Sequence, residues 1–182
     1  MKVNIINKPA MKIIGLTLNT SFKDGRNKAE IPPFFHKILE EGILNEVPYR
    51  LNTNQLCVFE MEKNNPDFAY TMGTEVSKAD AIPVSMKQIF LPASKYITLK
   101  TIKRGPEDVG KAFEFIYKNW IPASIYIPTG KPSFIYYDKD FFDIYNKQGY
   151  AGNPEATVFV PIRPFFIKSL LRFLGLKKFY KQ

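Results

Sequence analysis

The sequence predicts an α+β domain in which a strand-strand-helix-strand-strand unit occurs twice and forms one curved antiparallel sheet with two main helices on one side. Two observations carry this prediction. Residues 9–16 match residues 92–99 at five of eight positions, at an offset of 83 residues. The alternating and helical patterns around these two segments also follow the same order. A duplicated domain of this kind is expected to hold a ligand cleft between its repeats.

The first repeat is expected to span about residues 1–80. Its predicted elements are strands at 2–6 and 12–19, a helix at 31–41, and strands at 55–61 and 69–76. The helix is predicted to start at its pair of prolines, because proline suits the first turn of a helix. Phe35, Ile38 and Leu39 then fall on one face, which is typical of a helix that packs on a sheet.

The second repeat is expected to span about residues 84–163. Its predicted elements are strands at 86–91 and 95–102, a helix at 105–120, and strands at 133–138 and 157–162. Pro106 suits the first helical position, and Glu107 and Asp108 suit the positive end of the helix dipole. The connection 139–154 is predicted as a long loop of the kind that is often functional, although residues 141–145 could pack as a short helix.

The positive charge of the chain is concentrated at its end. The 182 residues carry a formal net charge of +9, and residues 163–182 hold six basic residues and no acidic one. Residues 164–175 have helical periodicity, with Lys168 and Arg172 opposite an apolar arc. The chain is therefore divided into a domain at 1–163 and a basic amphipathic tail at 164–182. The tail could dock on its own domain, on a second subunit of a homodimer, on a partner protein or on a membrane surface.

Composition excludes several function classes. Residues 1–162 carry only +3 and show no helix-turn-helix segment, so direct binding to nucleic acid is not expected. One cysteine (Cys57) and one histidine (His36) permit no disulfide and make a zinc site unexpected. No phosphate-binding loop or dinucleotide motif occurs, and we expect no cofactor. Because no apolar run is long enough for a signal peptide or a spanning helix, we expect a cytoplasmic protein.

Aromatic residues are the main candidates for a binding role. The chain has 16 Phe, 10 Tyr and 1 Trp. Tyr70, Tyr96 and Tyr137 fall in predicted strands, and Trp120 ends the second predicted helix. A cleft lined by such rings would suit flat or cationic ligands through stacking and cation–π contacts. The alternative is that these rings simply fill the core.

Several short segments resemble one known family. They are residues 70–76, 91–96, 112–120, 133–137 and 158–162. In order and spacing they are similar to the gyrase-inhibitor-like (GyrI-like) effector-binding domains. That family includes the ligand-binding halves of AraC-type and MerR-type multidrug-responsive transcription regulators, and stand-alone proteins. The resemblance covers roughly residues 1–163. It implies the duplicated fold described above, with aromatic or cationic drugs bound between the repeats.

The chain departs from this family at one position. The family's central glutamate pairs with cations in the regulators. In a hydrolase branch that opens cyclopropane-containing genotoxins, it acts with a tyrosine. Tyr96 and Tyr137 match the family motifs, but the glutamate position is Ile135. The cleft floor is therefore expected to be more apolar, unless Glu60 or Glu75 supplies a carboxylate from a neighbouring strand.

The function expected from these observations is non-catalytic binding of a small aromatic or apolar molecule, as in a transcription-effector domain that lacks a DNA-binding domain. The residues expected to contact the ligand are Phe35, Tyr70, Tyr96, Trp120, Ile135 and Tyr137. Two alternatives stay open. One is a hydrolase of electrophilic natural products with Tyr96 as its key residue. The other is an interaction or inhibitor protein that acts through its basic tail.

Overall fold

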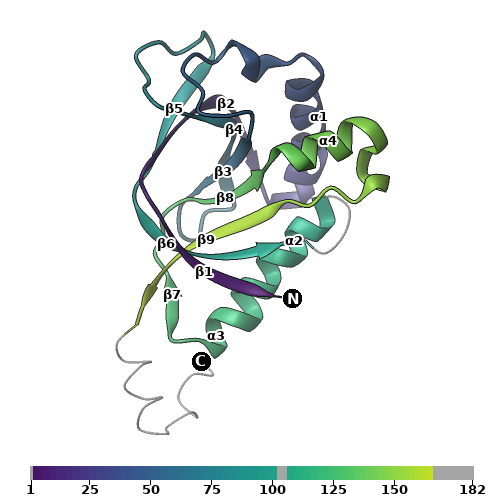
Figure 1. The fold of residues 1–182 in the computed structure, drawn as a ribbon. Coiled ribbons are helices and arrows are strands. Elements are labelled where there is room, and N and C mark those ends of the chain that lie inside the picture. The colour runs from purple at the N-terminus through teal and green to yellow at the C-terminus, as the bar shows by residue number, and fades with distance from the viewer. Residues whose placement is uncertain (1, 102–105, 166–182) are drawn as a thin grey trace, which may run out of the picture.

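The structure is a computed structural model that describes residues 2–101 and 106–165 (Figure 1). Its centre is one antiparallel sheet. In spatial order the strands are β1 (Val3–Lys8), β6 (Ser94–Lys100), β9 (Thr157–Pro164), β8 (Ser133–Tyr137), β3 (Gln55–Met61), β4 (Asp67–Val76), β2 (Met11–Ser21) and β5 (Met86–Leu91). A short strand, β7 (Tyr126–Pro128), also pairs with β9. The predicted α+β class with a curved antiparallel sheet is confirmed.

The strand order has the same plan on both sides of its centre. The central strands β3 and β8 pair with each other, and the strands of each half follow outward from them. The outermost positions are exchanged, because β1 pairs with β6 of the second half and β5 pairs with β2 of the first half. Each half therefore completes the sheet of the other.

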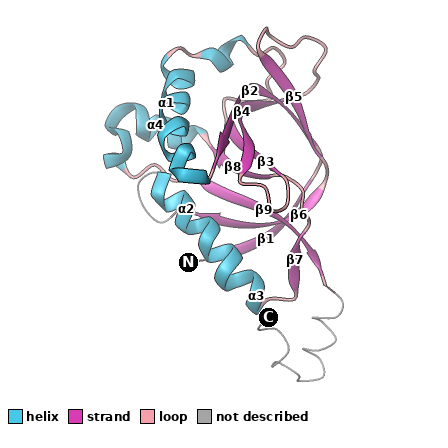
Figure 2. Cartoon of the chain, turned by 180° about the vertical axis from the view of Figure 1, so that it is seen from behind, coloured by secondary structure: helices cyan, strands magenta, loops and turns pink. Residues whose placement is uncertain are grey.

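The helices lie together on one side of the sheet (Figure 2). They are α1 (Arg26–Glu40), α2 (Pro106–Phe115) and α4 (Lys139–Gln148), and α2 continues through a π-helical turn (Ile116–Trp120) into α3 (Ile121–Ala123). Short 3₁₀ segments follow β2 at Lys23–Gly25, α1 at Ile43–Glu46 and α4 at Gly149–Gly152. Phe35 and Ile38 of α1, and Ala112 and Ile116 of the second helix, are buried as their spacing predicts.

Helix α1 starts earlier than the sequence predicts. It begins at Arg26 rather than near residue 31, and Pro32 and Pro33 lie inside it. Gly25 precedes it with φ of 69°, a left-handed conformation that glycine adopts without steric cost. Arg26 Nε lies 2.8 Å from Glu30 Oε1 within the first turns. Proline has no backbone N–H, so α1 lacks two of its helical hydrogen bonds at Pro32 and Pro33. We attribute the continuation of the helix past them to the packing of the apolar face that follows, which offsets this loss.

The segment predicted as a long loop after β8 is largely helical. Helix α4 covers its first ten residues, in agreement with the alternative of a short helix. Asp138 caps the helix, since its side chain accepts a hydrogen bond from the Phe141 backbone N–H at 2.9 Å. Strand β7 was not predicted, because three residues are too few for a periodic pattern.

Both faces of the sheet are buried. On the helix side, one cluster packs beneath α1 and α4 and another packs beneath α2. On the other side the sheet curves so that residues from its two halves meet each other. That second face contains Ile13, Leu56, Val58, Tyr96 and Phe134, each at most 1% exposed.

The predicted C-terminal helix falls mostly outside the described residues. Its first residue, Pro164, belongs to β9 and pairs with Tyr126, and the Phe165 backbone N–H donates to the Ile125 carbonyl at 2.9 Å. The chain thus leaves the domain as a strand at the point where a helix was expected. Residues 166–182, which carry the rest of the prediction, are not described. No helix in the described part of the chain is long and apolar enough to span a membrane.

Candidate functional site

A cavity of about 850 Å³ lies between the helices and the sheet. Eight aromatic side chains line it: Phe22, Phe35, Phe59, Tyr70, Phe113, Tyr117, Tyr137 and Phe141. They come from every layer around the cavity, namely β3, β4 and β8 of the sheet, α1, α4 and the long second helix, and the segment that follows β2. The volume lies within the usual range for pockets that hold drug-sized molecules.

The floor of the cavity is set by strand alternation at the centre of the sheet. Ile135 of β8 pairs with Cys57 of β3, and Tyr137 and Phe59 lie two residues along the same strands, so their side chains share one face. Ile135 is 3% exposed and Tyr137 is 7% exposed. The sheet therefore presents an apolar floor to the helices above it.

Ring contacts hold the aromatic walls in place. Phe59 meets Tyr70 at 5.3 Å and Phe113 at 5.5 Å between ring centroids, both edge to face. Tyr137 contacts Phe141 edge to face at 4.6 Å. Edge-to-face pairs add about 0.5–1.5 kcal/mol beyond the area they bury. The walls are thus already formed by contacts between the lining residues themselves.

Charged groups line only the rim of the cavity. They are Lys28 of α1 and Glu107, Lys111 and Glu114 of α2, and all four are exposed. Glu114 lies 2.8 Å from Lys118 Nζ, and this hydrogen bond lowers the pKa of the Glu114 carboxyl. Exposed ion pairs of this kind contribute little to stability. The rim charges balance, and the floor carries no charged side chain among the described lining residues.

His36 connects two of the helices at the cavity. Its Nδ1 lies 3.1 Å from the Tyr145 hydroxyl, so α1 and α4 are linked by a side-chain hydrogen bond. His36 therefore acts as a packing contact between the two helices.

Four of the six expected ligand contacts line this cavity. They are Phe35, Tyr70, Ile135 and Tyr137. The structure places the other two elsewhere. Tyr96 is 1% exposed on the opposite face of the sheet, where its ring meets Phe134 edge to face at 5.4 Å. Trp120 stacks on Tyr126 at 5.9 Å and packs with the core beneath α2. Neither residue lines the cavity.

The position of Tyr96 also bears on the hydrolase alternative. Burial raises the pKa of its phenol, and its face of the sheet is turned away from the cavity. The candidate substitutes for the missing glutamate lie elsewhere too, because Glu60 pairs with Lys87 Nζ at 2.7 Å and neither Glu60 nor Glu75 lines the cavity. The tyrosine and the carboxylates that the hydrolase alternative would use therefore do not line the cavity.

Some lining residues were not identified from the sequence. Phe113 lies one helical turn after Val109 on α2, and Phe59 alternates with Cys57 toward the same side as Ile135. That alternation was available as a signal for Phe59. Phe22 and Tyr117, which are 52% and 40% exposed, stand at the rim. Phe22 lies outside the helices and strands, so no periodic pattern points to it, whereas Tyr117 lies one turn after Phe113 on the same helix.

Comparison with known proteins identifies the family. The family of integron-associated effector binding proteins matches residues 4–162. The chain belongs to this family. The resemblance to effector-binding domains is thus confirmed. No curated protein matches the chain.

Solved structures with the same fold agree with this assignment. SAV2435, bound to tetraphenylphosphonium, matches with a TM-score of 0.71 at 13% identity, over 97% of this chain and 99% of that one. The C-terminal domain of EcmrR matches with a TM-score of 0.62 at 12% identity, over 90% and 98%. An integron cassette protein from the mobile metagenome of Vibrio cholerae matches with a TM-score of 0.56 at 14% identity, over 88% and 95%. At these identities the likeness establishes the fold of this chain.

Proposed function

We propose that this chain binds small aromatic or apolar molecules, without catalysis, in the cavity between the helices and the sheet. The observation that carries the proposal is the lining, eight aromatic side chains over an apolar floor at Ile135. Phe35, Tyr70, Ile135 and Tyr137 are the proposed ligand contacts from the original six, and Phe59 joins them. Membership of an effector-binding family supports the same function.

The energetics favour a flat or bulky apolar ligand. Apolar area removed from water contributes about 25 cal/mol per Å², so a ligand that buries about 200 Å² gains about 5 kcal/mol before the costs of association. The cavity of about 850 Å³ accommodates several fused or linked rings. SAV2435 was solved with a four-ring cation, which supports a bulky aromatic shape for the ligand. The floor of the present cavity offers no carboxylate to pair with a cation, so a neutral ligand is preferred.

The direct test is binding of neutral polyaromatic probes, measured by calorimetry and by displacement of the dye Nile red. Tryptophan fluorescence is unsuited as the reporter, because Trp120 lies outside the cavity. Phe113→Ala removes a wall of the cavity, and Phe90→Ala removes a ring that is 57% exposed on edge strand β5. We expect at least tenfold weaker binding for the first variant and wild-type binding for the second. Absence of binding across the probe panel, or equal effects of the two variants, would contradict the proposal.

A further inference from the structure

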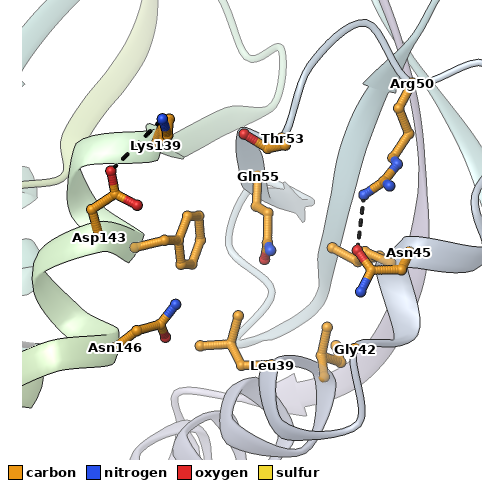
Figure 3. Close-up of a pocket in the computed structure, with 12 residues that line it drawn as sticks. Leu39, Gly42, Asn45, Arg50, Thr53, Gln55, Lys139, Asp143 and Asn146 are labelled. Carbon is orange, nitrogen blue, oxygen red and sulfur yellow. Dashed lines mark hydrogen bonds and ion pairs between the residues drawn. The ribbon is translucent and has the colours of Figure 1, made fainter.

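A second cavity, of about 310 Å³, lies at the C-terminal end of α1, beside α4 (Figure 3). It is lined by α4, the end of α1, the 3₁₀ segment Ile43–Glu46, the segment that carries Arg50 and Thr53, and the start of β3, and it opens to solvent. It shares no lining residue with the aromatic cavity. The two cavities are therefore separate sites, although the same two helices form walls of both.

The chemistry of this cavity differs from that of the aromatic one. Its apolar part consists of Ile38, Leu39, Leu44 and Phe142. Its polar part consists of four neutral side chains and three charged ones, namely Asn45, Thr53, Gln55, Asn146, Arg50, Lys139 and Asp143. Two cations against one carboxylate leave a net positive charge, so the lining favours an anionic ligand.

Gln55 supplies an acceptor that the fold does not use. Its Oε1 is buried and has no hydrogen-bond partner among the described residues, and its side chain points into the cavity between the α4 and α1 walls (Figure 3). A buried acceptor without a partner destabilises the folded state, because it has lost its hydrogen bonds to water. Gln55 lies in the cavity wall, so a rotation of its amide would bring Oε1 to an N–H or O–H donor on a bound molecule.

Arg50 supplies a hydrogen-bond donor on the wall opposite α4 (Figure 3). Its Nη1 donates to Asn45 Oδ1 at 3.1 Å, which holds the guanidinium beside the cavity. A guanidinium has five N–H donors in a planar fork that matches a carboxylate. Across the cavity, Lys139 Nζ and Asp143 Oδ2 are 4.0 Å apart and neutralise each other in part. Arg50 is therefore the anchor for a negative group.

We propose that this cavity is a second binding site, for a small carboxylate that carries N–H or O–H donors on a short apolar body. The carboxylate would pair with Arg50, a donor would reach Gln55 Oε1, and the apolar body would lie over Leu39 and Phe142. A volume of about 310 Å³ is at the lower limit for ligand pockets and fits a molecule the size of an amino acid.

The test uses three matched probes on the full chain, followed by calorimetry and by NMR shifts of the side-chain amides. L-Leucine carries all three features, 4-methylpentanoate lacks the ammonium donor, and leucinamide lacks the carboxylate. L-Glutamine and 4-aminobutanoate extend the panel with other donor positions. For so few atoms we expect binding in the micromolar to millimolar range. At least one complete probe should bind at least tenfold more tightly than the two incomplete ones.

Single substitutions test whether Arg50 and Gln55 contact the ligand or only stabilise the fold. Arg50→Gln and Gln55→Leu should each weaken binding at least tenfold, whereas Arg163→Gln, an exposed arginine outside both cavities, should leave it within twofold. Gln55→Leu should also leave the free energy of unfolding of the unliganded protein unchanged or higher, because it removes an unpartnered buried acceptor.

Four outcomes would overturn the proposal. They are no binding by any probe at millimolar concentration, equal binding of 4-methylpentanoate and the complete probes, no effect of Arg50→Gln, and competition with Nile red, which would assign the probe to the aromatic cavity. A loss of stability in Gln55→Leu without loss of binding would make Gln55 a structural residue.

Discussion

The decisive perturbation for the aromatic cavity is Ile135→Glu. Ile135 is 3% exposed on the floor, opposite Cys57 and near Tyr137 on the same strand. A carboxyl group introduced there leaves water for apolar surroundings, and desolvation raises its pKa above the usual value of about 4.3. Ile135→Gln is the matched control, because it has the same shape and no charge.

The size of the effect on stability follows from that rise in pKa. Below about pH 3 the acid is neutral in both the folded and the unfolded states, so it adds no electrostatic cost. As the pH rises from the unfolded-state pKa toward the folded-state pKa, the unfolded state ionises first and stability falls by about 1.4 kcal/mol per pH unit. For a rise of about 2–3 units, Ile135→Glu should be about 3–4 kcal/mol less stable than Ile135→Gln at neutral pH. Urea unfolding at several pH values measures this difference.

Ligand preference should change in the opposite direction. Two unit charges 4 Å apart attract by about 4 kcal/mol at an effective dielectric constant of about 20, and desolvation offsets part of this. We expect tetraphenylphosphonium to bind Ile135→Glu about 10- to 100-fold more tightly than Ile135→Gln at pH 8, with a smaller difference at pH 6 where the acid is largely neutral. The wild type should favour the neutral triphenylphosphine oxide. Equal affinities of both variants for the cation at pH 8 would refute the assignment of Ile135 to the ligand-binding floor.

Three further predictions concern other residues. Tyr96→Phe should leave binding of neutral polyaromatic probes within twofold, because its ring faces away from the aromatic cavity; a large loss by calorimetry would argue against this placement. Gly15→Ala should destabilise the protein by about 3 kcal/mol in urea, since its Cβ would collide with the Met72 carbonyl. Gly110→Ala in α2 has open space and should stabilise by about 0.5–1 kcal/mol; equal effects at the two glycines would contradict the packing. Burial raises the pKa of the Cys57 thiol to about 12, so a thiol reagent at pH 8 should label it only on unfolding, and rapid labelling of the native protein would exclude that burial.

The order of the elements could be predicted from the sequence because strands and helices leave different periodicities. The start of α1 could not be, since a pair of prolines usually marks a first turn and here lies inside the helix. For α4 the signals were present. Asp138 stands where an N-cap belongs, and Phe141 and Tyr145 are one turn apart. Gly149, Gly152 and Pro154, which follow within a few residues, favour a loop and so pointed the prediction the other way.

The sequence predicted those site residues whose side chains could be placed on one face of a strand. Ile135 and Tyr137 share a strand face, so they stay together whichever side the cavity lies on. Tyr96 lies in a strand whose next three residues are all buried, so the pattern does not tell the two faces apart. Trp120 completes an apolar stripe, and such a stripe fits a packed core as well as a cleft wall.

The exchanged outer strands have a consequence for how the chain reaches its native state. Val3 pairs with Leu99, although β2 starts only a few residues after β1, and Met11 pairs with Leu91. Pairing between positions so distant in the sequence is slow, because the entropy of closing a long loop must be lost before the contacts form. During synthesis, the first half cannot complete its side of the sheet until β5 has emerged, and the second half cannot do so until β9 has emerged. Fragments cut between the halves should therefore not fold separately, but should associate when mixed.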